Sequence, residues 1–266
     1  MLYYEIYDNQ KEDWVVFIHG IGGSTKTWKR QIEDFSKCYN LVLLDLHGHG
    51  KSKLDGKITV KSTNEEIKEV LDYLNIKKAN FVGLSLGTVV IAQFAIKYPE
   101  YVKAIVLGGA VLKVEGFYKF GMWVANKIKH ILPKNITYKL FAGIVIPAKW
   151  HKKSREIFIS ESKKLSRETF LSWMDYASVS INPTPILEKL KKLGIRIFFV
   201  SGNKDVCFID GVKKIAKDIK NARLRIIKDC GHICTIEKAT EFNRLAIAFL
   251  NNIQENNCRK QIFVKA

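Results

Sequence analysis

Runs of consecutive apolar residues alternate along the chain with segments in which apolar residues recur at helical spacing. The runs are rich in valine, isoleucine, leucine and phenylalanine, which is typical of strands buried on both faces of a sheet. The sequence predicts such strands at residues 14–18, 41–44, 80–82, 104–107, 195–200 and 224–227.

Segments with helical spacing separate these strands. Ser62-Thr63-Asn64-Glu65 has the pattern of a capping box, so one helix is expected to begin there. Helices are predicted at residues 28–36, 62–75, 91–97, 212–219 and 239–250, and the polar tail from 251 onward is expected to be loosely ordered. The alternation predicts an α/β fold with a mostly parallel central sheet flanked by helices.

The alternation stops between residues 111 and 185. Aromatic and basic residues crowd together there, helical spacing dominates and no buried strand is predicted. The segment ends in Asn182-Pro183-Thr184-Pro185, which cannot continue a helix. We therefore expect residues 1–110 and 186–266 to form the core, and residues 111–185 to form a helical insertion.

Gly83-Leu84-Ser85-Leu86-Gly87 lies between a predicted strand and a predicted helix. A serine at the tip of such a turn needs small residues two positions before and after it, because strand and helix approach closely. The free N–H groups at the start of the helix can stabilise a developing negative charge. The stretch suits a nucleophile, although the same five-residue pattern also occurs in ordinary turns.

A nucleophilic serine needs a histidine base and an acid that orients the base. Of the six histidines, only His232 follows a late predicted strand of the sheet, and Asp205 follows the strand before it. Asp210 is a rival acid, but its position at the start of a helix suits a helix-terminal charge. The predicted catalytic residues are Ser85, Asp205 and His232.

Together these features resemble the α/β-hydrolase fold family over nearly the whole chain. The resemblance rests on the serine turn, on Gly231-His232 before the last helix, and on two loop signatures, His19-Gly20 and Asp45-x-x-Gly48-x-Gly50-x-Ser52. It implies an oxyanion hole formed by the backbone N–H groups of Ile21 and Leu86. It also implies that the insertion is a cap over Ser85. We expect the substrate to contact Trp28, Trp123, Phe141 and Trp173, with packing as an equal alternative for the cap aromatics.

The resemblance implies a serine hydrolase that needs no cofactor and cleaves a carboxylic ester, thioester or lactone (EC 3.1.1). The aromatic cap favours an apolar small-molecule substrate. A serine at this position argues against epoxide hydrolases and haloalkane dehalogenases, in which an aspartate occupies it. A carbon–carbon bond hydrolase, or a triad-bearing receptor that signals through a protein partner, remains open because the fold alone does not select the chemistry.

The net charge of +18 does not change the prediction of a hydrolase. Only eight of the 44 basic residues are arginines and the lysines are spread along the chain, which favours a solvated basic surface over a nucleic-acid site. The basic, aromatic insertion is compatible with weak contact with an anionic membrane. The sequence does not predict the oligomeric state.

Five scattered cysteines and a start without a signal peptide or apolar span predict a cytoplasmic protein. Cys230, His232 and Cys234 lie close together but lack a second ligand pair, so no metal site is predicted.

Overall fold

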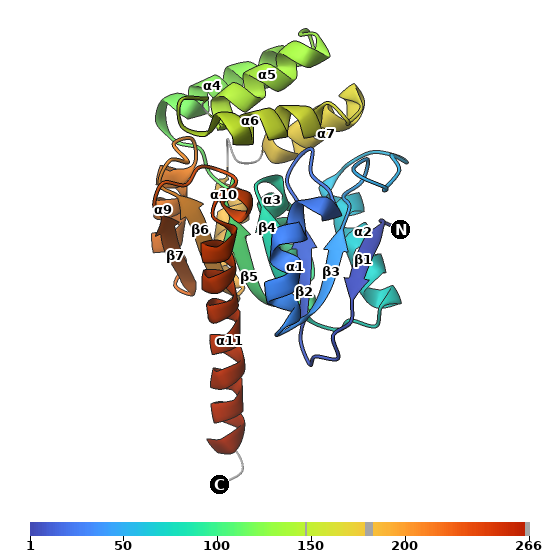
Figure 1. Ribbon diagram of the computed structural model, residues 1–266, viewed down its shortest axis with the longest axis vertical. Helices are drawn as coiled ribbons and strands as arrows, with labels where there is room; N and C mark the ends of the chain where they lie inside the picture. Colours follow the sequence, from blue (N-terminus) through green and yellow to red (C-terminus); the bar gives the residue numbers. More distant parts are fainter. Residues whose placement is uncertain (147, 179–182, 264–266) are drawn as a thin grey trace.

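The computed structural model describes residues 1–146, 148–178 and 183–263, with the backbone alone described at 134, 148–150, 153 and 252–263. Its centre is a seven-stranded sheet between two layers of helices (Figure 1). In spatial order the strands are β1 (Tyr4–Tyr7), β3 (Asn40–Leu44), β2 (Trp14–Ile18), β4 (Ala79–Leu84), β5 (Val102–Gly108), β6 (Arg196–Gly202) and β7 (Ala222–Ile227). The predicted α/β fold with a mostly parallel sheet is confirmed.

The central strands form because both of their faces are covered. Strands β3 and β4 are buried at every residue, as is β2 after its first residue, which explains their continuous apolar runs. All neighbouring strands pair in parallel except β1, which runs antiparallel to β3 with Tyr4 opposite Leu44. The sequence analysis missed β1 because this edge strand is half-exposed and has no continuous apolar run.

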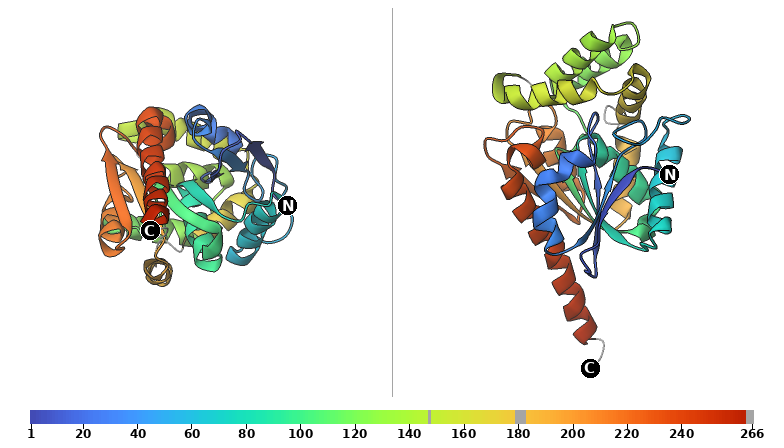
Figure 2. Two further views of the ribbon diagram at one scale, coloured as in Figure 1. Left: turned by 90° about the horizontal axis from the view of Figure 1, so that it is seen from below. Right: turned by 45° about the vertical axis from the view of Figure 1, so that its right-hand side comes forward.

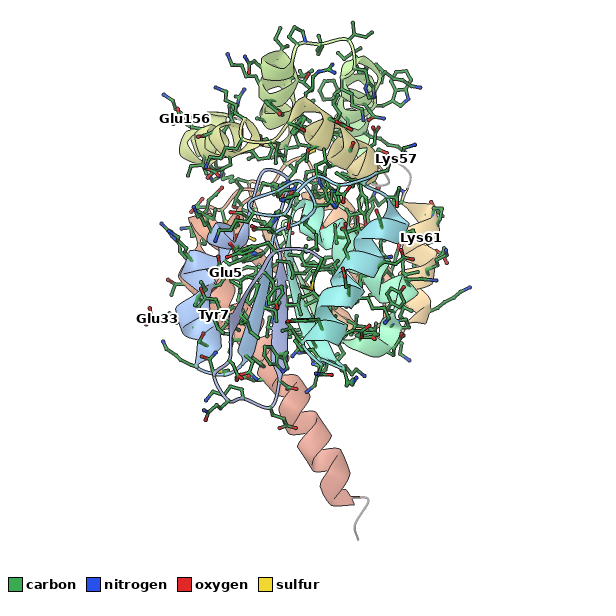
Figure 3. All side chains as sticks on the ribbon, turned by 90° about the vertical axis from the view of Figure 1, so that its right-hand side faces the viewer. Glu5, Tyr7, Glu33, Lys57, Lys61 and Glu156 are labelled. Atoms are coloured by element: carbon green, nitrogen blue, oxygen red, sulfur yellow. The ribbon has the colours of Figure 1, made fainter. Side chains whose placement is uncertain are left out.

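Two helical layers enclose the sheet (Figure 1, Figure 2). On one face α1 (Lys29–Ser36) packs against α11 (Ala239–Phe263), and on the other α3 (Leu86–Lys97) packs between α2 (Val60–Tyr73) and α8 (Thr184–Lys192). Helix α9 (Ile209–Asp218) packs against β6 and β7. The short helices are η1 (Thr25–Trp28), η2 (Pro99–Tyr101) and α10 (Cys234–Glu237). In the side-chain view Glu33 and Lys61 lie on outer helix faces (Figure 3), and both are exposed.

Four helices lie across the edge of the sheet where the parallel strands end, and we call them the cap (Figure 1, Figure 2). They are α4 (Gly116–Ile128), α5 (Lys134–Val145), α6 (Ala148–Ser162) and α7 (Arg167–Ala177). Helix α6 is kinked at His151, whose backbone is not helical. The described residues between 111 and 178 contain no strand. Because α8 packs against α3 of the core, the insertion predicted to reach residue 185 contributes cap helices only as far as Ala177.

Two other predicted boundaries differ from the structure. Helix α2 begins at Val60, where the side chain of Thr59 accepts a hydrogen bond from the amide of Ser62 and forms the capping box. Ser62 is therefore the third residue of the helix and not its cap. At the other end of the chain, α11 continues to Phe263, well past the predicted end at residue 250. None of the described helices combines the length and apolar character needed to cross a membrane.

Candidate active site

Ser85 occupies the abrupt turn between β4 and α3. Its backbone has φ 52° and ψ −119°, a conformation that is rare for a residue with a side chain and that turns the chain sharply into the helix. Gly83 and Gly87 cannot carry a side chain, because neighbouring atoms occupy the space that a Cβ would need. A Cβ on Gly87 would overlap the carbonyl oxygen of Ile18, and a Cβ on Gly83 would lie 2.6 Å from Cδ1 of Ile91. The turn therefore fits only because glycine flanks the serine on both sides.

Thr88, which the sequence analysis did not single out, holds this turn in place. Its hydroxyl donates a 2.6 Å hydrogen bond to the carbonyl oxygen of Ser85 and accepts one of 3.2 Å from the amide of Val111. The side chain is fully buried. Thr88 thus ties the turn to the chain segment that leaves β5.

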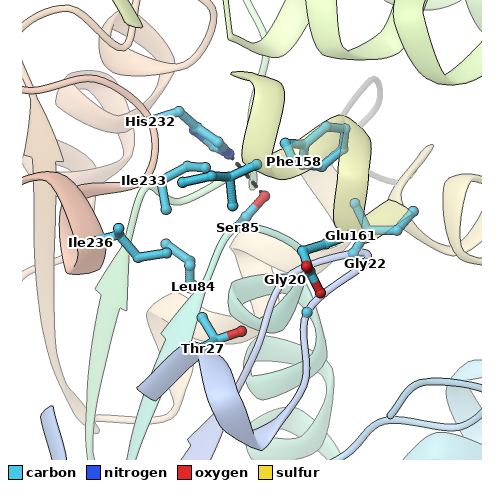
Figure 4. A pocket seen from close by; sticks show the side chains of 13 residues that line it. Gly20, Gly22, Thr27, Leu84, Ser85, Phe158, Glu161, His232, Ile233 and Ile236 are labelled. Carbon is cyan, nitrogen blue, oxygen red and sulfur yellow. Dashed lines mark hydrogen bonds between the residues drawn. The ribbon is translucent and has the colours of Figure 1, made fainter. Parts of the chain in front are cut away.

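His232 lies on the loop after β7 and faces Ser85. Its Nε2 is 2.8 Å from Oγ of Ser85, the distance at which a general base can take the hydroxyl proton (Figure 4). The ring is buried and packs against Phe208, with 5.2 Å between ring centroids. Gly109 leaves room for the backbone here, since a Cβ at this position would overlap the His232 carbonyl oxygen.

Asp205 lies behind His232, after the end of β6. Its Oδ2 is 3.1 Å from Nδ1 of His232, and the carboxylate is buried. A carboxylate in this position accepts a hydrogen bond from the Nδ1–H group, which leaves Nε2 without a proton and able to take the proton of Ser85. The rival Asp210 lies in the first turn of α9, exposed and paired with Lys213 at 3.1 Å. The structure therefore brings together Ser85, His232 and Asp205.

The loop after β2 brings backbone N–H groups to the serine. Gly20 lies so close that an added Cβ would be 3.1 Å from Cβ of Ser85. Beyond it, the amides of Gly22 and Gly23 are bonded to His49 and to the Gly20 carbonyl, whereas the amide of Ile21 has no acceptor among the described residues. Leu86 is the first residue of α3, where helix N–H groups lack partners within the helix. In the part of the chain that the structure describes, neither the Ile21 amide nor the Leu86 amide has an acceptor, and both residues line the second cavity together with Ser85.

Two buried histidines fix this loop by accepting hydrogen bonds from backbone amides. Nε2 of His49 accepts a 3.0 Å hydrogen bond from the Gly22 amide, and Nε2 of His19 accepts one of 3.0 Å from the Leu46 amide. Both rings are fully buried, and burial lowers the pKa of His19 and lowers that of His49 well below its usual range. Both histidines are therefore neutral acceptors at pH 7.

Asp45 joins the same loop to the one after β3. Its carboxylate accepts hydrogen bonds of 2.6 Å from the Thr25 amide and 2.8 Å from the Lys51 amide. Ser52 donates a 2.6 Å bond to the Asp45 carbonyl oxygen. The second loop signature, from Asp45 to Ser52, thus serves to hold backbone and does not reach Ser85.

Two apolar cavities meet at Ser85. Figure 4 shows the residues that line the first of them. The first contains about 470 Å³ of empty space, part of it open to solvent. It is lined by the loop after β2, by α10 and by one side of α6, from which Ile157, Phe158 and Glu161 contribute. The second contains about 370 Å³ and is lined by Val111, Met122, Phe141, Val145, Met174, Ala177 and Phe208, besides Ile21, Ser85 and Leu86. Ser85 and Ile21 therefore border both cavities.

Of the four predicted substrate contacts, the structure places only Phe141 on a cavity wall. Trp28 is fully buried in the core, with its ring centroid 4.9 Å from that of Phe17. Trp173 is fully buried beside His49 and donates a 3.0 Å hydrogen bond to the His47 carbonyl oxygen. Trp123 is 49% exposed on the outside of α4. These three tryptophans lie away from both cavities, so we do not retain them as substrate contacts.

The site holds no reactive thiol. Burial raises the pKa of Cys230 to about 12 and also raises that of Cys207 and Cys234. Among the described side chains, no group of three or more His, Cys, Asp or Glu residues could hold a metal ion. Cys230 and Cys234 instead point their sulfurs at the carbonyl oxygens of Gly231 and Val200, each at 3.6 Å.

A family model described as alpha/beta hydrolase fold matches residues 13–239. The chain belongs to this family. Among curated relatives of this alpha/beta hydrolase, 3-oxoadipate enol-lactonase 1 of Acinetobacter baylyi is 24% identical over 90% of this chain and 89% of its own length. A 2-hydroxy-6-oxo-6-phenylhexa-2,4-dienoate hydrolase of Comamonas testosteroni is 28% identical over 89% of this chain and 87% of its own.

Solved structures agree with this membership at the level of the fold. A carboxylesterase structure from Nitrososphaera gargenis superimposes with a TM-score of 0.79 at 21% identity and covers 96% of both chains. The enol-lactonase of Burkholderia xenovorans superimposes with a TM-score of 0.76 at 18% identity, over 94% of this chain and 96% of its own. The relatives are hydrolases that act on small molecules, and they differ in the bond that they cleave.

Proposed function

We propose that this alpha/beta hydrolase is a serine esterase that cleaves an ester-type bond of an apolar, uncharged small molecule. In the proposed reaction Ser85 attacks the carbonyl carbon while His232 takes its proton and Asp205 stabilises the resulting imidazolium. The amides of Ile21 and Leu86 stabilise the oxyanion. His232 then protonates the leaving alcohol. In the second half of the reaction His232 takes a proton from water, the water oxygen attacks the acyl carbon, and His232 returns the proton to Ser85 as the acid leaves. The observation that carries the proposal is the 2.8 Å contact between His232 and Ser85.

The lining of the cavities favours a neutral ester over a carboxylate-bearing substrate. Among the described residues that line the two cavities there is no lysine or arginine, and the only charged side chain is Glu161. An anionic substrate would lose its hydration without a cationic partner and would also face a like charge. This argues against the dienoate named for the Comamonas relative, and so against carbon–carbon bond hydrolysis of such acids as the alternative function.

The test is turnover of p-nitrophenyl esters by the wild-type protein and by Ser85→Ala. The substitution should lower kcat on the order of 10⁶-fold, as loss of a triad nucleophile can. Thr27→Val is the matched control, because Thr27 lines the same cavity without reaching the triad in any hydrogen bond of the described structure. Activity of Ser85→Ala within tenfold of wild type would exclude the proposed nucleophile.

Two further measurements separate the proposal from its alternatives. A neutral butyrate ester should react faster than a hemisuccinate ester of the same alcohol, and the reverse order would point to an acid substrate. Repeated turnovers are expected for an enzyme. A single burst of p-nitrophenol equal in concentration to the protein, with no further release, would instead indicate a receptor that retains its acyl group.

A further inference from the structure

The outer face of the cap exposes large apolar side chains. Phe117 is 82% exposed and Phe120 62% exposed on α4, and Phe120 stacks on Trp123 with ring centroids 6.1 Å apart. The turn into α5 and α5 itself add Ile131, which is 83% exposed, and Ile136. We call these five side chains the apolar patch. It lies on the two helices that form the end of the molecule opposite the carboxyl terminus (Figure 1).

The same segment carries charge of one sign. Between residues 116 and 155 the sequence has no aspartate or glutamate and nine basic residues. Lys119, Lys127 and Lys139 are exposed on α4 and α5, beside the apolar patch. Lys129 differs, since it is buried and paired with Asp175 of α7. The outer face of α4 and α5 thus combines aromatic and aliphatic side chains with exposed lysines.

The inner faces of these two helices belong to the site. Met122 of α4 and Phe141 and Val145 of α5 line the second cavity at Ser85. Burial of these inner residues explains how α4 and α5 are held against the core. It does not account for the outer face, because a cluster of large apolar side chains exposed to water is unfavourable and usually marks an interaction site.

We propose that the outer face of α4 and α5 binds the surface of an anionic lipid bilayer, with the apolar patch inserted between headgroups and the lysines facing lipid phosphates. Helices that lie in a membrane interface have this composition, with Trp, Phe and Leu on one face and Lys or Arg beside them. Each lysine near an anionic bilayer strengthens binding about fivefold, so three of them contribute on the order of a hundredfold.

Charge favours a lipid surface over a second copy of the chain. In a two-fold dimer through this face the patch would contact its own copy, so both sets of lysines would meet. No acidic residue of the segment could pair with them. An anionic bilayer accepts both the apolar side chains and the positive charge.

The test is co-sedimentation of the whole protein with vesicles of phosphatidylcholine, with and without phosphatidylglycerol, at low and high salt. The wild-type protein should sediment with the anionic vesicles at low salt and be released at high salt. Phe117→Ser combined with Phe120→Ser should weaken binding at least tenfold, because two exposed rings are removed. Lys119→Glu combined with Lys127→Glu should abolish the preference for anionic vesicles.

Two controls distinguish the patch from the general basicity of the protein. Tyr73→Ser removes an aromatic ring that is 65% exposed on α2, away from the cap. Lys217→Glu combined with Lys220→Glu reverses two exposed charges at the carboxyl end of α9. Both controls should bind vesicles within about threefold of wild type. All variants should unfold at the wild-type temperature, which shows that the fold is intact.

Several outcomes would overturn the proposal. These are no sedimentation at low salt, equal binding to neutral and anionic vesicles, or equal losses in the cap variants and in the controls. An oligomer in light scattering that the two phenylalanine substitutions dissociate would show that the patch binds a second copy instead. The measurement requires no turnover, so its result is independent of the proposed esterase activity.

Discussion

The fit of Gly87 against the end of β2 gives the most direct test of the turn that carries Ser85. Gly87→Ala would place a methyl group against two backbone atoms, overlapping the carbonyl oxygen of Ile18 and lying 2.8 Å from that of His19. Backbone cannot rotate away as a side chain can, so the first turn of α3 must shift. That shift moves Ser85 relative to the loop that holds Ile21. We therefore expect losses in both stability and kcat.

The size of the effect follows from two opposing contributions. Overpacking by one carbon costs roughly 1–3 kcal/mol, whereas alanine in place of glycine in a helix gains about 0.5–1 kcal/mol. The difference between these ranges is roughly 0–2.5 kcal/mol. Because the overlap is with backbone, we expect the upper part, about 1–2 kcal/mol, which lowers the Tm of a chain of this size by roughly 2–8 °C. Displacement of the serine by about 1 Å should lower kcat on the order of 10²-fold.

Gly121→Ala is the matched control within the same protein. Gly121 lies inside α4, and no atom lies within 4 Å of the Cβ that alanine would add. The helix gain is unopposed there, so Tm should rise by roughly 1–4 °C with kcat unchanged. The assays are thermal unfolding by circular dichroism and turnover of a p-nitrophenyl ester. If Gly87→Ala kept the wild-type Tm and kcat, the close approach at the turn would be refuted.

Two further predictions concern pH and thiol chemistry. Burial lowers the pKa of His19 and His49 in the folded state, so below about pH 6.5 the unfolded chain binds protons that the native protein does not. The free energy of unfolding should therefore fall by up to about 1.4 kcal/mol per pH unit for each histidine as the pH is lowered. Urea unfolding at pH 7.5, 6.5 and 5.5 measures this decrease. Burial raises the pKa of Cys230 to about 12, so with an aromatic disulfide reagent at pH 8 its thiol should react only after denaturant is added.

The pH prediction and the thiol prediction each have their own control. His49→Gln keeps an acceptor for the Gly22 amide but does not titrate, so it should flatten the pH dependence, and an unchanged slope would remove His49 as a cause. For the thiols, Cys38 is only partly buried and should react without denaturant, and Cys38→Ser should remove that reaction. Rapid labelling of Cys230 in the native protein would contradict the buried position found for it.

The order of the chain allowed much of the site to be predicted. Parallel strands end at one edge of the sheet, so residues directly after β4, β6 and β7 had to lie near one another. Ser85 and His232 met that condition, and Asp205 was favoured over the rival acid Asp210. The structure places Ser85, His232 and Asp205 in a chain of hydrogen bonds, and their catalytic roles stay a prediction. The hydrolase family is confirmed, whereas the bond that is cleaved stays a proposal.

The roles of the aromatic residues could not be predicted, because the sequence does not say which face of a helix meets the core. Trp28, Trp123 and Phe141 were all expected to contact the substrate, yet Trp28 is in the core, Trp123 is exposed and Phe141 lines a cavity. The hydrogen-bond partners of the loop histidines His19 and His49 could not be predicted either. Their function is to accept backbone hydrogen bonds, and this depends on contacts between loops that are far apart in the sequence.

The position of the cap within the chain separates the residues that set the register of the sheet from many of those that shape the cavities. The chain leaves the sheet after β5 and returns at β6, two strands that pair directly, and α8 alone supplies the helix that a parallel crossover requires. Helices α4, α5 and α6 are therefore additional to the crossover, although their residues form much of the two cavity walls. Substitutions there can change which molecule fits at Ser85 while the register of the strands stays the same. New substrate preferences can thus arise by exchange of this segment between related chains, without a new sheet having to evolve.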